Sequence, residues 1–139
     1  MSLRKACGSF LIIALLGALA LALAGCGSSG GDVVVTGADT GELVTLDAGQ
    51  KLVVRLESNP STGYSWEVVG VPRVLEGPAA PTHEQNSEAE GVVGAAGTDV
   101  FTFIASDDAG DGTLVLAYRR PWETDVPAEE EFVLEVIVR

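Results

Sequence analysis

Short apolar runs separated by glycine, proline, asparagine and aspartate make up the chain from Asp32 onward. Hydrophobic side chains recur at every second position in these runs, which is the spacing of a β-strand with one buried face. The alternation is clearest at the C-terminus, where Phe132, Leu134, Val136 and Val138 share a face. The pattern predicts strands at Glu42–Asp47, Lys51–Glu57, Ser65–Val71, Thr98–Ala105, Gly112–Arg119 and Glu131–Val138.

Six or seven such strands with turns between them favour two packed sheets over a closed barrel. No stretch of this region shows three turns of helical periodicity. We therefore expect an all-β domain, an antiparallel sandwich of about seven strands. The proline-rich, polar region 72–97 is the exception, and it predicts a long connection with at most one short strand.

A different pattern precedes the strands. An uncharged apolar run extends from Phe10 to Ala24, and Arg4 and Lys5 lie just before it. As a helix at about 1.5 Å per residue the run is about 22 Å long, whereas a bilayer core is about 30 Å thick. The run is therefore typical of a signal peptide rather than of a membrane-spanning anchor.

The run ends in Leu23-Ala24-Gly25-Cys26, before glycines and serines, and resembles the lipobox of bacterial lipoproteins. The resemblance implies that Cys26 carries diacylglycerol and an acyl group such as palmitate, and that the exported protein is anchored to the bacterial cell envelope. Residues 1–25 are then the signal peptide, 26–40 the lipidated Cys and a flexible tether, and 41–139 the folded domain. The alternative is an ordinary secretory peptide with an unmodified Cys26.

Composition and charge narrow the classes of partner. The 139 residues include 20 acidic and 8 basic side chains, a formal charge of −12. This excludes a nucleic-acid partner, because phosphate contacts need clustered lysine and arginine. Loss of Cys7 with the signal peptide and lipidation of Cys26 leave no disulfide, so the fold depends on its hydrophobic core.

Residue patterns for catalysis are incomplete, and we expect neither an enzyme nor a cofactor. The single histidine, His83, lies in a polar stretch without an accompanying nucleophile. Residues 63–67 begin like a nucleophile elbow, but Glu67 stands where the closing glycine belongs. Asp107 and its acidic neighbours lack the spacing of a calcium loop, and no cysteine–histidine set for zinc is present.

Three turn-rich segments contain residue types that are more specific than a simple connection between strands requires. They are Asn59-Pro60-Ser61-Thr62-Gly63-Tyr64, Gly94-Ala95-Ala96-Gly97 and Arg120-Pro121-Trp122. Pro60 fixes its own backbone angle and Gly63 allows a positive φ, so the first segment should hold one shape without a partner. Trp122 follows a proline after a strand, and we expect it to be exposed like an interface anchor. Trp66, on the next strand, is expected in the core.

These three segments resemble the motifs of the chagasin family of cysteine-protease inhibitors. The family carries Asn-Pro-[Ser/Thr]-Thr-Gly-[Tyr/Phe], then Gly-x-Gly-Gly, then Arg-Pro-[Trp/Phe]. Asn59 to Tyr64 and Arg120 to Trp122 match fully, whereas Ala96 stands where the second motif has glycine. The resemblance covers roughly residues 41–139.

The resemblance implies an immunoglobulin-like β-sandwich that inhibits papain-like cysteine proteases reversibly. The three segments would lie at one end and enter the active-site cleft, with Thr62 across the catalytic cysteine and with Arg120 and Trp122 near the catalytic histidine. We expect a monomer, with the membrane contacted only through the lipid. The alternative function is a cell-envelope adhesion or assembly lipoprotein that uses the same loops to bind a surface protein or glycan.

Overall fold

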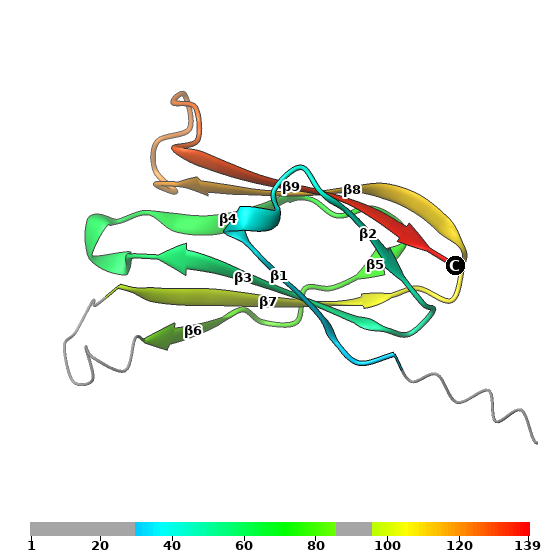
Figure 1. The fold of residues 1–139 in the computed structure, drawn as a ribbon. Coiled ribbons are helices and arrows are strands. Elements are labelled where there is room, and N and C mark those ends of the chain that lie inside the picture. The colour runs from blue at the N-terminus through cyan, green and yellow to red at the C-terminus, as the bar shows by residue number, and fades with distance from the viewer. Residues whose placement is uncertain (1–29, 86–95) are drawn as a thin grey trace, which may run out of the picture.

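The computed structural model describes residues 30–85 and 96–139, which form two β-sheets packed face to face (Figure 1). The strands are β1 (Val33–Thr36), β2 (Leu43–Leu46), β3 (Lys51–Ser58), β4 (Ser65–Gly70), β5 (Leu75–Glu76), β6 (Thr82–Gln85), β7 (Gly97–Ala105), β8 (Gly110–Arg119) and β9 (Glu130–Val138). Two short 3-10 helices, η1 (Gly37–Asp39) and η2 (Pro60–Thr62), complete the described elements. The predicted all-β sandwich is confirmed.

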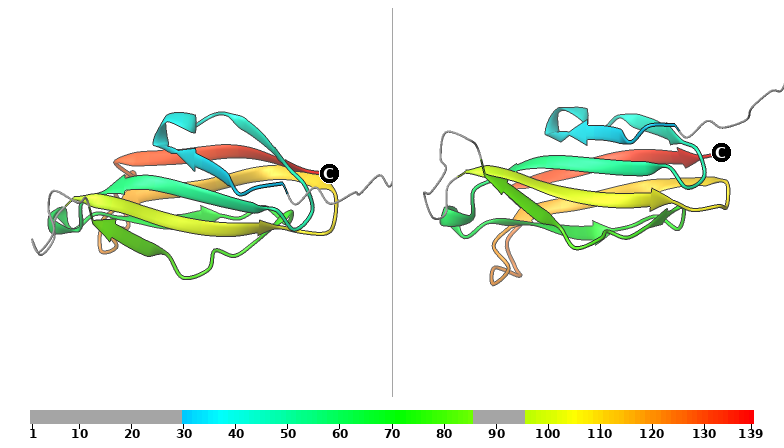
Figure 2. Two further views of the ribbon diagram at one scale, coloured as in Figure 1. Left: turned by 60° about the horizontal axis from the view of Figure 1, so that its bottom comes forward. Right: turned by 90° about the horizontal axis from the view of Figure 1, so that it is seen from below.

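Strands β1 to β4 alternate between the two sheets, whereas β5 to β7 lie in one sheet and β8 and β9 in the other. One has the order β1-β3-β7, with β5 and β6 both paired to β7, and the other has the order β2-β9-β8-β4. The pairs β1–β3 and β2–β9 are parallel, so the prediction of a purely antiparallel sandwich is wrong at these two edges. The cause is the β1–η1–β2 segment, which runs along one margin of the sandwich in Figure 2 and adds one strand to each sheet.

The core lies between the sheets and consists of the alternating side chains that the sequence pattern identified. Four β9 side chains share one face and are buried: Phe132, Leu134, Val136 and Val138. The inward side chains of β3, β7 and β8 are buried as well. The largest fully buried side chains are Phe103, Phe132, Leu46, Leu52, Leu56, Leu114, Leu116 and Leu134. No cysteine lies in the described residues, so no disulfide joins the sheets there, and the buried apolar side chains hold them together.

Three short strands depart from the sequence prediction. Residues 33–36 form β1, and Val35 is only 4% exposed, so the flexible segment predicted through residue 40 ends earlier. Region 72–97 contains two strands, β5 and β6, rather than at most one. None of these segments shows alternation, because β1 begins with three valines, β5 has only two residues and β6 is polar throughout. Residues 1–29, which include the predicted signal peptide and Cys26, lie outside the described residues.

Strand β6 is held on β7 by polar contacts. The Arg55 guanidinium of β3 lies 2.5 Å from Glu84, and the hydrogen bond between them, with their charge attraction, lowers the pKa of the Glu84 carboxyl. The His83 Nδ1 lies 2.7 Å from the Asp99 carboxylate. All four β6 residues are exposed, so these pairs and the backbone ladder carry the attachment. Within the described ranges, no helix is long and apolar enough to span a membrane.

Phe103→Ala should lower the free energy of unfolding by about 3–5 kcal/mol, because it leaves a cavity between the sheets. Ile104→Ala is the matched control, since Ile104 lies next to Phe103 but is 44% exposed on the outer face. Its effect should be about 0.5 kcal/mol or less. Chemical denaturation measures both, and equal effects would contradict the assigned faces.

Candidate functional site

The strand register brings the predicted segments to one end of the sandwich. Ser58 at the end of β3 pairs with Gly97 at the start of β7, and Ser65 at the start of β4 pairs with Arg119 at the end of β8. The β3–β4 loop, the residues before β7 and the β8–β9 connection therefore leave the sheets at the same end (Figure 1).

The first loop is stabilised by its own hydrogen bonds. The Asn59 side-chain oxygen accepts bonds from the Ser61 backbone N–H at 3.2 Å and from the Ser61 hydroxyl at 2.6 Å. The Thr62 hydroxyl donates to the Asn59 carbonyl at 2.7 Å. Gly63 closes the turn with a φ of 79°, in the left-handed region that favours glycine. The loop keeps its shape without a partner, as its proline and glycine predicted.

Arg120 joins the third segment to the first. Its Nε donates a hydrogen bond to the Thr62 carbonyl at 3.3 Å, and its Nη1 lies 3.2 Å from the Glu123 carboxylate. The guanidinium carbon lies 4.5 Å from the centre of the Tyr64 ring, within cation–π distance. Arg120 is thus held by three groups at once, and two of them belong to the first loop.

A row of aromatic side chains supports both loops from below. Tyr118 stacks on Tyr64 with ring centres 5.3 Å apart, and the Trp66 and Tyr118 ring centres are 5.1 Å apart. The Asn59 backbone N–H donates to the Tyr118 hydroxyl at 3.0 Å, and the Trp66 indole N–H donates to the Glu57 carbonyl at 2.9 Å. Tyr118 was not among the predicted site residues, although it continues the inward phase of Leu114 and Leu116.

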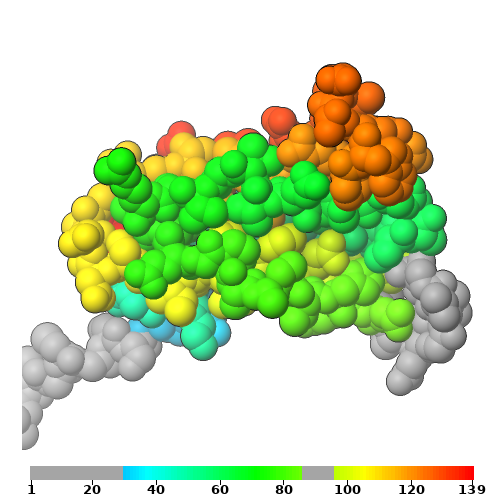
Figure 3. Space-filling model, turned by 180° about the vertical axis from the view of Figure 1, so that it is seen from behind, coloured from blue at the N-terminus to red at the C-terminus, as the bar shows by residue number. Residues whose placement is uncertain are grey.

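Trp122 projects from this end beside the first loop. Its side chain is 67% exposed, as its place after Pro121 predicted. A Cβ added to Gly63 would lie only 2.7 Å from the edge of the Trp122 ring, so the absence of a side chain at Gly63 lets the indole lie close. In Figure 3 the β8–β9 connection, in orange, protrudes above the first loop.

The second segment is only partly described. Gly94 and Ala95 lie outside the described residues, whereas Ala96 is exposed and Gly97 is the first residue of β7. A Cβ on Gly97 would overlap the Glu84 carbonyl oxygen, so the close approach of β6 requires glycine there. At Ala96, where the family motif has glycine, the methyl group lies on the surface.

A hollow of about 300 Å³ lies between the first loop and this segment. Ser58 and Asn59 line one side, Ala96 and Gly97 the other, and Tyr118 also contributes. No group of three metal-ligating side chains occurs in ranges 30–85 and 96–139. This end therefore presents a preformed surface with a protruding indole, an arrangement suited to binding a macromolecule.

The chain was compared with known proteins. The family described as "Chagasin family peptidase inhibitor I42" matches residues 45–136. Amoebiasin-1 from Entamoeba histolytica is 31% identical over 99 residues, which cover 69% of this chain and 89% of that protein. Chagasin from Trypanosoma cruzi is 29% identical over 102 residues, or 72% and 92% of the two chains.

Solved structures share the fold. The cysteine protease inhibitor EhICP2 from Entamoeba histolytica superposes with a TM-score of 0.66 at 19% identity, covering 78% of this chain and 96% of that one. PbICP-C, solved in complex with falcipain-2, gives a TM-score of 0.50 at 18% identity, covering 80% and 93%. At these identities the two matches support the fold alone.

Gly63→Ala should displace the Trp122 indole, because the new methyl group would occupy its place. Gly49→Ala is the matched control: Gly49 has a φ of 74°, and a Cβ there meets nothing within 4 Å. Both variants should lose about 1–2 kcal/mol of stability from a left-handed alanine. Only Gly63→Ala should shift the Trp122 indole N–H signal in a ¹⁵N NMR spectrum. An unchanged Trp122 signal would contradict the contact.

Proposed function

Because this chain belongs to the chagasin family of peptidase inhibitors, we propose that it inhibits papain-like cysteine proteases by placing its loop end in their active-site cleft. Family membership also confirms the expectation that the chain is not an enzyme. The observation that carries the proposal is the direct linkage of the Asn59–Tyr64 and Arg120–Trp122 loops into one protruding unit.

Rigidity of this unit favours tight and reversible binding. The bonds around Asn59 and the contacts of Arg120 already hold the loops in place, so little loop entropy remains to be lost when a protease binds. In the proposed complex Thr62 and its neighbours lie across the catalytic cysteine. Trp122 packs on the cleft wall, and Arg120 holds the two loops together. Inhibition follows from occlusion and needs no covalent bond.

Trp122→Ala should weaken inhibition of papain by about 30-fold, equivalent to about 2 kcal/mol for the loss of an exposed aromatic anchor. Val126→Ala is the matched control, because Val126 lies in the same β8–β9 connection and is 53% exposed. It should leave the inhibition constant unchanged. Residual papain activity measures the constant, and trypsin serves as the class control.

Two results would contradict this proposal. The first is equal inhibition by wild type and Trp122→Ala, which would show that the Arg120–Trp122 segment lies outside the interface. The second is no inhibition of papain or of a cathepsin L-type enzyme by micromolar wild-type protein. That result would instead favour the envelope adhesion role.

Lipid anchoring through Cys26 is part of the proposed role, and the fold is compatible with it. The Gln50 side chain donates a hydrogen bond to the Gly31 carbonyl at 2.7 Å, so the chain enters the sandwich beside the β2–β3 turn. This turn lies at the end opposite the candidate loops (Figure 1). A protein anchored at Cys26 would therefore direct its loops away from the membrane.

Cys26→Ser should move the exported protein from the membrane fraction to the soluble fraction and leave the inhibition constant for papain unchanged. The reason is that Cys26 supplies the lipid but lies far along the chain from the loops. Fractionation and immunoblotting measure the distribution, with wild type as the reference. Wild-type protein in the soluble fraction would contradict the lipid anchor.

A further inference from the structure

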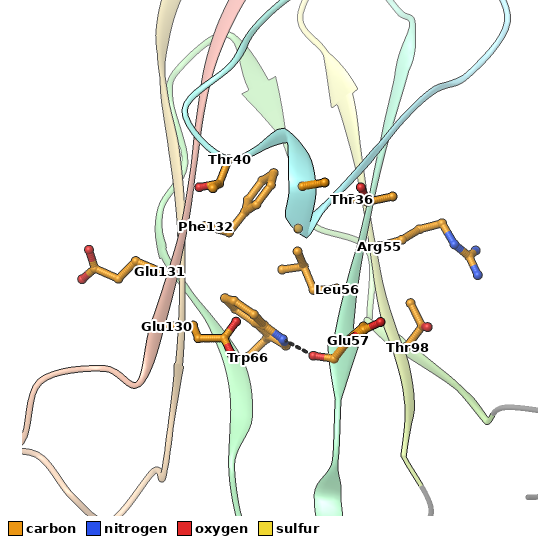
Figure 4. Close-up of a pocket in the computed structure, with 12 residues that line it drawn as sticks. Thr36, Thr40, Arg55, Leu56, Glu57, Trp66, Thr98, Glu130, Glu131 and Phe132 are labelled. Carbon is orange, nitrogen blue, oxygen red and sulfur yellow. Dashed lines mark hydrogen bonds between the residues drawn. The ribbon is translucent and has the colours of Figure 1, made fainter.

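One margin of the sandwich is hollowed beside the loop end (Figure 4). The opening has a volume of about 740 Å³ and lies between η1, β3, β4 and β9. It exists because the edge strands are short. Strand β1 covers β3 only as far as Arg55, and β2 covers β9 only from Glu135 onward. Between these points and the loops, the gap between the two sheets is open at the side.

Glu130 occupies an unusual position at this opening. Phe132 and Leu134 of β9 point inward and are buried, and Glu130 has the same phase along the strand. It also pairs in register with Tyr118, which pairs with Trp66, so the three residues form one row across the sheet. Tyr118 is the middle residue of this row, and Glu130 and Trp66 on either side of it both line the opening (Figure 4). A carboxylate thus stands where the pattern calls for a core side chain.

The charge of Glu130 is not matched within the part of the chain that the structure describes. None of the ion pairs there includes Glu130. Arg55 is the one basic residue among those lining the opening, but its guanidinium pairs with Glu84 and points away in Figure 4. Glu130 is exposed at the opening, so its carboxylate can pair with a basic group from outside the chain.

Trp66 supplies a flat apolar surface in the same opening. Its indole N–H already donates to the Glu57 carbonyl, so the ring rather than the N–H remains for a ligand. An aromatic ring beside a carboxylate favours a cation carried on an aliphatic stem, since the stem packs on the ring and the cation pairs with the acid. Lysine and arginine side chains have this form.

We propose that this opening binds a basic peptide segment, with a lysine or arginine side chain lying along Trp66 and paired with Glu130. Charge complementarity supports this occupant, because the chain carries a formal charge of −12. The opening also shares Glu57, Thr98 and Glu130 with the smaller hollow behind the first loop. A segment of a protein held at the loops can therefore continue into it. Binding of the peptide goes beyond protease inhibition and does not depend on it.

The test uses the indole N–H signals of the ¹⁵N-labelled full-length protein in a non-ionic detergent. The chain has two tryptophans, so the Trp66 signal can be told apart from that of Trp122. Titration with acetylated tetra-arginine amide should shift the Trp66 signal saturably and leave the Trp122 signal unmoved. Acetylated tetraserine amide is the neutral control and should shift neither.

Glu130→Gln should weaken tetra-arginine binding at least tenfold while leaving the free energy of unfolding unchanged or higher. The matched control is Glu131→Gln, which removes the same charge one residue further along β9. Glu131 also contributes to the lining, but in Figure 4 its side chain points in the direction opposite to Trp66, so this variant should bind as wild type does.

Either of two outcomes would overturn the proposal. No shift of the Trp66 signal at millimolar peptide would mean that the opening takes no basic side chain. Equal losses in the two variants would mean general attraction to an acidic protein rather than a site at Glu130. Papain inhibition by the same variants is measured separately, so failure of the inhibitor function and failure of this site are distinguishable.

Discussion

Burial of alternate side chains between the same two sheets fixes the register of every long strand pair. A slip of one residue in β8 or β9 would turn Leu116 and Phe132 outward and bring polar neighbours into the core. The register in turn decides where strands begin and end. Because Ser58 lies opposite Gly97 and Arg119 opposite Ser65, three connections leave the sheets together. The candidate surface is therefore a consequence of core packing.

Further contacts define the shape of the loops and their position relative to each other. Bonds within the Asn59–Tyr64 loop define its shape, but they do not place it relative to the β8–β9 connection. Tyr118 does so from within the sheet, since its hydroxyl accepts a bond from Asn59 and its ring stacks on Tyr64. Arg120 makes the matching link outside the sheet. Tyr118 lies near the end of β8 and Arg120 directly follows that strand, so a single strand aligns the two loops.

Much of this arrangement could be predicted from residue patterns, and the limits have physical causes. Alternation located β2, β3, β4, β7, β8 and β9 to within about two residues, and the motif residues predicted the positive φ of Gly63 and the exposure of Trp122. Strands β1, β5 and β6 were missed because none of them contains a run of alternating apolar and polar residues. The parallel edges and the Arg120–Thr62 bond depend on which strands pair, which alternation does not encode. The predicted last strand began at Glu131, so sequence analysis did not show that Glu130 shares the inward phase of that strand.

The opening at the margin is determined by where the chain crosses between sheets. Thr36 ends β1, and its backbone N–H donates to the Asp39 carboxylate at 2.7 Å, which closes η1 immediately afterwards. The Thr40 hydroxyl then accepts a bond from the Val133 N–H at 3.1 Å and fixes the approach to β9. Had β1 continued for another three residues, it would have covered the edge of β3 as far as Ser58. The crossing at η1 instead leaves Trp66 and Glu130 accessible, so local capping bonds create a second surface that the core alone does not require.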